Sequence, residues 1–130
     1  SSVTDMRTMF EEATAFNQPL STWKVSSVTK MYKMFANATS FNQDLGVWDV
    51  SNVADMEAMF KDAKAFNNKY DEDEMGDWNV SNVITMKDMF RNAESFNRDL
   101  SEWDVSGVDI SSHFGHGSGM TQAQMPNFEE

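Results

Sequence analysis

The sequence of 130 residues contains no cysteine, two prolines and two histidines, and its ten basic residues face 21 acidic ones. The absence of cysteine excludes disulfides, thiol catalysis and cysteine-ligated zinc. The net charge of −11 repels phosphate groups and anionic lipid, so we expect no nucleic-acid partner and no anionic membrane surface as partner. No apolar run is long enough to span a bilayer, and direct membrane insertion is not expected.

One hexapeptide recurs along the chain, and it defines a repeat. It reads WKVSSV from Trp23, WDVSNV from Trp48, WNVSNV from Trp78 and WDVSGV from Trp103. The units cover residues 1–25, 26–50, 51–80 and 81–105, followed by a degenerate unit at 106–130. Such a period is typical of stacked units that cannot bury their apolar faces alone. We therefore predict a single repeat domain with a C-terminal cap.

The spacing of apolar residues changes within each unit. Five positions of the first unit recur at intervals of three and four, as on an amphipathic helix: Met6, Met9, Phe10, Ala13 and Phe16. The W-x-V centre alternates as in a short strand. Helices are expected to begin near residues 4, 29, 54 and 84, and parallel strands are expected over 23–25, 48–50, 78–80 and 103–105. The predicted fold class is an α/β solenoid with one strand and one helix per repeat.

The unit LGVWDVSNVADMEAMFKDAKAFN, residues 45–67, resembles the repeat of BspA-like surface proteins, which is also found in mycoplasma-type lipoproteins. The shared pattern is W-D-V-S-N-V-x-x-M-x-x-M-F-x-x-A-x-x-F-N, and the match runs over residues 1–105. The resemblance implies a leucine-rich-repeat-like solenoid, an extracellular or cell-surface location, and a role in adhesion or protein interaction. It implies no catalytic residues. The insertion in the third unit and the tail after Val105 depart from the pattern.

Two columns of polar residues next to the W-x-V centre are the candidate binding positions. They comprise Lys24, Asp49, Asn79 and Asp104, and then Ser26, Ser51, Ser81 and Ser106. By analogy with leucine-rich-repeat proteins, these residues line the exposed sheet face where a ligand binds. The alternative is a solvated polar ladder without a ligand. The Met, Phe and Trp columns could form an aromatic trough, but their spacing favours a packed core.

Two further segments carry weak metal-binding signals. The acidic run at 71–74 offers Asp71, Asp73 and Glu74, but the spacing of an EF-hand loop is missing and a solvated loop is favoured. Met75 then restores the leucine slot three residues before Trp78. In the tail, His113 and His116 form an H-x-x-H pair without further ligands. More simply, Ile110, His113, Phe114 and Gly117 repeat the Met, Met, Phe and Ala slots after a one-residue deletion.

Taken together, these patterns predict a non-enzymatic interaction or adhesion module at a cell surface, with no cofactor and no resident metal. The expected ligand is a protein or a glycoconjugate, bound by the sheet face and its rims. The alternative function is a structural or scaffolding subunit of a larger assembly. The first unit, with Val3 and Met6 uncovered, favours membership of a larger chain or complex.

Overall fold

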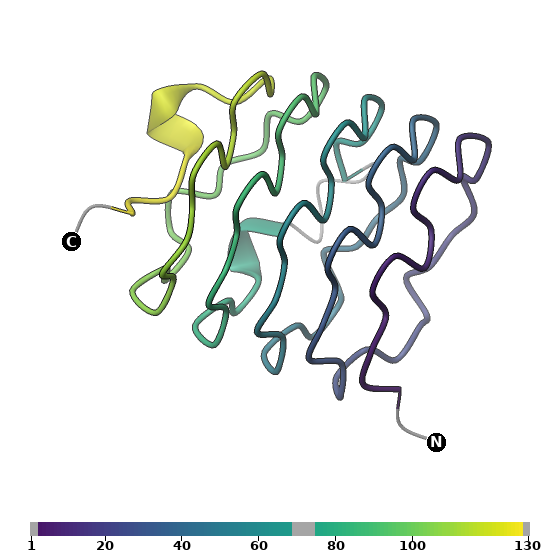
Figure 1. The fold of residues 1–130 in the computed structure, drawn as a ribbon, viewed down its shortest axis with the longest axis horizontal. Coiled ribbons are helices and arrows are strands. Elements are labelled where there is room, and N and C mark those ends of the chain that lie inside the picture. Colours follow the sequence, from purple (N-terminus) through teal and green to yellow (C-terminus); the bar gives the residue numbers. More distant parts are fainter. Residues whose placement is uncertain (1–2, 69–74, 129–130) are drawn as a thin grey trace.

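A computed structural model describes residues 3–68 and 75–128 of the chain. The chain winds through successive circuits that stack side by side, and the two termini lie at opposite ends of the stack (Figure 1). We call each circuit a layer. Layers 1 to 4 correspond to residues 1–25, 26–50, 51–80 and 81–105, and layer 5 begins at residue 106.

The predicted α/β fold is wrong. Among residues 3–68 and 75–128 there is neither an α-helix nor a strand. The helical elements of this part of the chain are two short 3₁₀-helices, η1 (Met75–Asp77) and η2 (Gln122–Gln124). The segments expected to be helices consist of consecutive turns, and the segments expected to be strands are irregular. A leucine-rich-repeat-like solenoid with strands and helices is therefore excluded for the described residues.

Layer 3 shows why the Met/Phe segment is not helical. Alternate backbone amides donate to carbonyl oxygens of layer 4, over 2.8–3.1 Å, and these amides belong to Met56, Ala58, Phe60 and Asp62. Amides between them donate three residues back along their own layer, as Met59 does to Met56 over 3.2 Å. In an α-helix, by contrast, nearly every backbone amide donates a hydrogen bond to the carbonyl oxygen four residues earlier. Half of the hydrogen bonds of this segment thus join the layers.

Left-handed backbone conformations separate these turns. Each layer has positive φ at two positions that lie four residues apart, as at Ala58 (φ 55°) and Asp62 (φ 60°). The first column consists of Thr8, Lys33, Ala58, Asp88 and His113. The second column consists of Glu12, Asn37, Asp62, Asn92 and Gly117. A residue with positive φ interrupts a right-handed helix, so each such position redirects the chain.

Parallel pairing between layers occurs only as isolated bridges in the described part of the chain. The bridges join Asp5 to Lys30, Lys30 to Asp55, Asp55 to Thr85, and Thr85 to Ile110. The last bridge corrects the expected register of the tail. Ile110 occupies the polar bridge column rather than the first Met slot, and there is no one-residue deletion. Ile110 is consequently 49% exposed.

The core consists of side-chain columns that run through the layers, which confirms the core interpretation of the Met and Phe positions. One column of stacked rings contains Phe10, Phe35, Phe60 and Phe90, and a second contains Phe16, Phe41, Phe66 and Phe96. Within layer 3 the two columns meet, because the rings of Phe60 and Phe66 lie 4.3 Å apart. Both rings are fully buried. Successive layers therefore share one continuous apolar interior.

The tryptophan column adds a hydrogen bond from each layer to the one before it. The indole N–H of Trp48 donates to the Leu20 carbonyl over 3.0 Å, and that of Trp78 donates to the Leu45 carbonyl over 3.0 Å. Trp103 repeats the contact with the Met75 carbonyl over 2.8 Å. These three side chains are at most 5% exposed. Trp23 in layer 1 is the exception to the predicted burial, since it is 37% exposed.

The asparagines after the second Phe column connect neighbouring layers rather than adopt a left-handed conformation. None of Asn17, Asn42, Asn67 and Asn97 has positive φ. The side-chain oxygens of the first three accept backbone amides of the next layer, as Asn42 Oδ1 does from Asn67 over 2.9 Å. The same contact joins Asn17 to Asn42 over 2.8 Å and Asn67 to Asn97 over 3.0 Å. The asparagine side chain thus provides a hydrogen-bond acceptor for a backbone amide that donates to no carbonyl within a turn.

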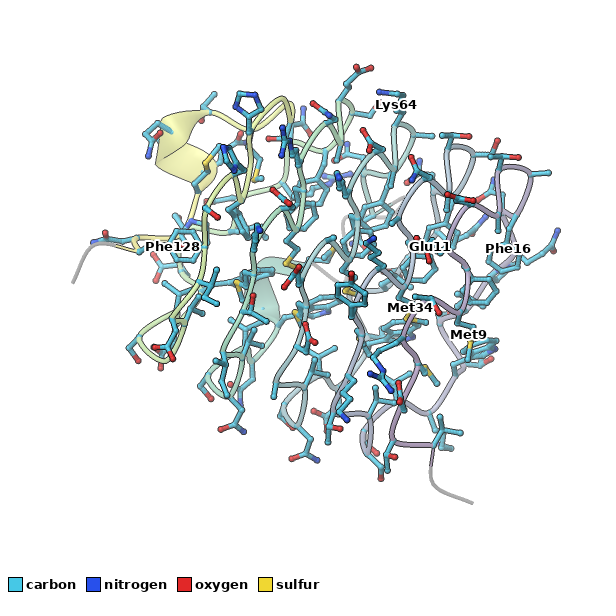
Figure 2. The ribbon with its side chains drawn as sticks, viewed as in Figure 1. Met9, Glu11, Phe16, Met34, Lys64 and Phe128 are labelled. Carbon is cyan, nitrogen blue, oxygen red and sulfur yellow. The ribbon has the colours of Figure 1, made fainter. Side chains whose placement is uncertain are left out.

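The two ends of the stack differ. At the C-terminal end Phe114 and Met120 are buried, and the Phe128 ring lies 5.1 Å from the Phe114 ring. Figure 2 places Phe128 at this end, and Met9 and Phe16 at the opposite end of the stack. There Met9 is 45% exposed, although the equivalent Met34 is fully buried. Apolar side chains cover the last layer, while no described residue covers the first.

Met75 occupies the leucine slot as expected: it is fully buried, and its carbonyl accepts the Trp78 amide over 3.0 Å. Deleting Lys69 to Asp73 restores the 25-residue period, so we predict an unchanged or slightly higher melting temperature. Thermal unfolding of the two proteins, with and without millimolar calcium, checks this. We expect calcium to affect neither protein. A large loss of stability on deletion would contradict the register of Met75.

Candidate functional site

The candidate binding residues lie on an exposed corner of each layer. Seven of the eight are exposed and Ser51 is half-buried. Lys24 follows Trp23, and Asp49, Asn79 and Asp104 occupy the same position in the next three layers. We call this surface, made of those four residues and the four serines, the W-x-V corner. Because the described chain contains no sheet, the predicted sheet face is replaced by this row of corners.

Most of the corner side chains form hydrogen bonds with a residue two positions away and thereby stabilise a local turn. Asp49 Oδ1 accepts the Ser51 amide over 3.0 Å and the Ser51 hydroxyl over 2.6 Å. Asn79 with Ser81, and Asp104 with Ser106, repeat both contacts. This is an Asx-turn, in which the side chain replaces a backbone acceptor. The columns that were expected to bind a ligand therefore also hold each corner in shape.

Sequence reasoning missed the role of two asparagines that follow these serines. Asn52 Nδ2 donates to the Ser26 carbonyl over 2.7 Å, and Asn82 Nδ2 donates to the Ser51 carbonyl over 2.7 Å. Each amide group thus ties a corner to the corner of the preceding layer. Their recurrence at one repeat position was visible in the sequence, but it does not reveal an acceptor in another layer.

The corner hydrogen bonds favour the ionised carboxylates. The Ser51 hydroxyl and then its backbone amide lower the pKa of Asp49 from the ordinary value of 3.8. Ser106 lowers the pKa of Asp104 in the same way, and Ser101 lowers that of Asp99. A carboxyl group with a depressed folded-state pKa stabilises the fold above its unfolded pKa. That contribution is lost as the pH falls through the folded pKa.

We therefore predict that acid destabilises the protein below about pH 4 partly through these three groups. The variant with Asp49→Asn, Asp99→Asn and Asp104→Asn should lose less stability between about pH 4 and pH 2, because Asn79 forms the same turn without titrating. Urea unfolding at several pH values measures the difference. Parallel pH profiles for the two proteins would show that these carboxylates do not contribute.

Two hollows open on the W-x-V corner. The first has a volume of about 460 Å³ and lies between layers 1 and 2, where Trp23, Lys24, Ser26, Val47 and Asp49 contribute to its wall. The second has a volume of about 380 Å³, and its wall includes Trp103, Asp104, Ser106 and Asn127 of the tail. Both hollows are open to solvent, and a hollow of about 460 Å³ also lies outside the corner, beside Asp5, Arg7 and Tyr32. The structure thus brings candidate residues of neighbouring layers together around shared space.

Metal-binding groups do not converge in the part of the chain that the structure describes. Residues 3–68 and 75–128 contain no cluster of three or more His, Asp or Glu side chains suited to a metal ion. The weak candidates Asp71, Asp73 and Glu74 lie outside the described residues. The rings of His113 and His116 have centroids 5.7 Å apart, and His113 Nδ1 lies 3.8 Å from Asp88 Oδ1. Arg91 also approaches Asp88 Oδ1, at 3.5 Å, and its charge opposes a cation there.

The described part of the chain contains no helix with the length and apolar character of a membrane span.

The comparisons with known proteins concern the repeat. The family described as "Mycoplasma protein of unknown function, DUF285" matches residues 1–75 and again residues 70–127. Curated proteins and solved structures gave no match. The two matches account for the repeat units and for most of the tail, and they do not extend to a leucine-rich-repeat relationship. The chain therefore belongs to this mycoplasma-type family of repeat proteins.

Proposed function

We propose that the protein is a non-enzymatic interaction module that binds a protein or a glycoconjugate at a cell surface. One observation carries the proposal: the exposed W-x-V corner recurs in four layers and borders two open hollows. Polar side chains spaced by the repeat can contact an extended partner at several points, as in other stacked-repeat proteins. The similarity to BspA-like surface proteins supports the location and the adhesive role by analogy alone.

The chemistry of the corner favours binding over catalysis. Asp49 and Asp104 accept serine hydroxyls, but these contacts lower the pKa of both carboxyl groups and make them weak bases, and the amide of Asn79 is not a base. Both histidines lie in the tail, away from the corner residues in sequence. Recognition of a partner needs only exposed donors, acceptors and apolar surface; the corner supplies donors and acceptors, and the exposed Val47 beside it is apolar.

Binding of the labelled protein to immobilised extracellular-matrix proteins and glycoproteins tests the proposal. We expect saturable binding that a corner variant with Lys24→Ser, Asp49→Asn and Asp104→Asn weakens at least several-fold. The matched control is Lys64→Ser with Glu94→Ser, a surface ion pair of 3.3 Å away from the corner residues, and it should bind as the wild type does. Equal effects of both variants, or no saturable binding, would contradict the proposal.

A second candidate function, a structural subunit that associates with other copies, is favoured by one specific observation. The N-terminal end of the stack exposes Val3 (44%), Met9 (45%) and Trp23 (37%), whereas the equivalent Met34 and Trp48 in layer 2 are buried. Burying such a patch against a second copy would release apolar surface from water. Sedimentation equilibrium then shows a concentration-dependent oligomer that Met9→Glu abolishes. A monomer at all concentrations leaves the interaction module as the remaining candidate.

A further inference from the structure

Two segments of the chain carry the acceptor pattern for N-linked glycosylation, in which serine or threonine follows asparagine by two residues. They are Asn37-Ala38-Thr39 in layer 2 and Asn79-Val80-Ser81 in layer 3. So short a pattern is common by chance, and the structure has to show which asparagine suits the reaction. A suitable asparagine is exposed, keeps its Nδ2 atom free, and has the hydroxyl group of the pattern close to its carboxamide.

Asn79 meets all three requirements. It is exposed on the W-x-V corner of layer 3, and its Oδ1 accepts the Ser81 hydroxyl over 2.7 Å and the Ser81 amide over 3.1 Å. Its Nδ2 forms no hydrogen bond with a residue of the described part of the chain. Layers 2 and 4 flank this position, so its exposure does not depend on an end of the stack. The nitrogen that would carry a sugar is therefore accessible and unoccupied.

The turn at Asn79 favours the chemistry of sugar transfer. In that reaction a bond forms between Nδ2 and C1 of the sugar, and the bond between C1 and the phosphate oxygen of a glycosyl diphosphate breaks. The diphosphate leaves with the electron pair, and Nδ2 gives one proton to a base of the transferase. Negative charge then develops on Oδ1, where the hydroxyl and amide of Ser81 stabilise it as in an oxyanion hole. Because these contacts lie within residues 79–81, the turn can form before the layers stack.

Asn37 lacks these features, although its sequence fits the pattern equally well. It is half-buried, has φ 61°, and its backbone amide donates to the Lys61 carbonyl of layer 3 over 2.8 Å. No described residue donates to its Oδ1, and Thr39 in particular does not. Charge that develops on this oxygen would have no donor within the pattern. The structure thus favours Asn79 over Asn37 as the acceptor.

The surroundings of Asn79 leave room for a sugar. Asn79 belongs to the wall of neither corner hollow, and a substituent on Nδ2 would displace no hydrogen-bond partner. Asp49 and Asp104 occupy the same column in the adjacent layers, and each uses Oδ1 for its own turn. Their Oδ2 atoms accept no bond from a described residue and can accept hydroxyl groups of the first sugar. A bulky polar group at this position is compatible with the fold.

We propose that Asn79 is a site of N-linked glycosylation and that Asn37 is not. The substrate class is a glycosyl diphosphate, either a nucleotide sugar that supplies one hexose or a lipid-linked donor that supplies an oligosaccharide. The proposal rests on the proposed cell-surface location, because this modification belongs to exported chains. It goes beyond the interaction function, since it places a glycan in the middle of the W-x-V corner, between the two hollows.

Peptide mass spectrometry of the protein isolated from the surface of its own cells tests the proposal. We expect the peptide that contains Asn79 to carry a sugar and the peptide that contains Asn37 to be unmodified. The mass of the sugar distinguishes a single hexose from a preassembled oligosaccharide, and hence the two kinds of donor. An unmodified Asn79 peptide would overturn the proposal, and a sugar on Asn37 would overturn the choice between the two sites.

The repeat provides matched variants for the same measurement, with the chain secreted from a eukaryotic host. Asn79→Asp recreates the turn of layers 2 and 4, so it should remove the sugar and leave the melting temperature of the unmodified chain unchanged. Ser81→Ala should lower the occupancy about tenfold or more, and Ser81→Thr should retain it. In the Asn79→Asp background, Asp49→Asn creates the same pattern and turn in layer 2 and should restore one sugar. Absence of modification there, or modification of Asn37, would show that the turn does not select the site.

The interaction function is tested separately with unmodified protein from bacteria that lack such a transferase. If native Asn79 carries no sugar but this protein binds the immobilised glycoproteins, the modification fails and the interaction function stands. If native Asn79 carries a sugar and neither form of the protein binds, the modification stands and the interaction function fails.

Discussion

Replacing Trp48 by alanine is expected to lower the free energy of unfolding by about 3–5 kcal/mol. The side chain is 4% exposed, packs 6.3 Å from the Phe35 ring and donates its indole N–H to the Leu20 carbonyl over 3.0 Å. The substitution opens a cavity in layer 2 and leaves the Leu20 carbonyl without its donor. Urea unfolding followed by far-UV circular dichroism measures the loss.

The repeat supplies matched controls for this prediction. Trp23 occupies the same column in layer 1, where it is 37% exposed and donates to no described residue, so Trp23→Ala should cost about 1 kcal/mol. Asp49→Ala removes only the turn contacts with Ser51 on the exposed corner, and it too should cost about 1 kcal/mol. Similar losses at Trp48 and Asp49 would mean that the indole does not lie in the core.

Phe60→Ala is expected to destabilise the protein to a similar extent, by about 3–5 kcal/mol. Its ring contacts Phe35 at 5.5 Å, Phe90 at 5.2 Å and Phe66 at 4.3 Å, and it is fully buried. Truncation removes stacking on both sides of layer 3 at once. Because layers contact only their neighbours, we also expect a broader unfolding transition as the two halves of the stack lose coupling.

Phe10→Ala in layer 1 is the comparison for Phe60. Phe10 belongs to the same ring column but has a ring from that column on one side only, Phe35 at 5.5 Å. Its loss should therefore be roughly half that of Phe60. Equal losses for the two variants would contradict a continuous column of rings through the layers.

The repeat boundaries and the identity of the core could be read from the sequence, because a repeated apolar position is buried in nearly every layer. Met56 and Phe66 illustrate this, since both are fully buried where the spacing predicted an apolar interior. The exceptions, Met9 and Trp23, are exposed because no described residue precedes layer 1. Burial at the end of a stack depends on a neighbouring layer that the internal pattern does not specify.

The secondary structure could not be predicted in the same way, because helices and turns share a spacing of three residues. In layer 2 the carbonyls of Leu45, Val50 and Phe35 accept amides three residues later. Apolar residues at i and i+3 flank the two central residues of a β-turn just as they share a helix face. The spacing was assigned to a helix, although consecutive turns account for it equally well.

One signal for the turns was present in the sequence. The second positive-φ column contains Asn37, Asp62, Asn92 and Gly117, and these residue types tolerate the left-handed conformation. In the first column only Asp88 and His113 carry such a signal, since Thr8, Lys33 and Ala58 do not. The Asx-turns of the corner were also readable, since Asp49 precedes Ser51 by two residues. The backbone groups in adjacent layers that pair with the asparagine side chains could not be identified from the sequence.

Position 62 tests the central claim, that left-handed turns replace the helix, most directly. Asp62 has φ 60° and is half-buried, and its carboxylate forms no hydrogen bond or ion pair with a described residue, so Asp62→Gly and Asp62→Ala remove the same polar interactions. The measurement is the difference in unfolding free energy between these two variants. In a left-handed position glycine avoids the steric strain that alanine carries, and the glycine variant should be more stable by about 1 kcal/mol. In a helix the order is reversed, so an alanine variant more stable by about 1 kcal/mol would contradict the turn structure.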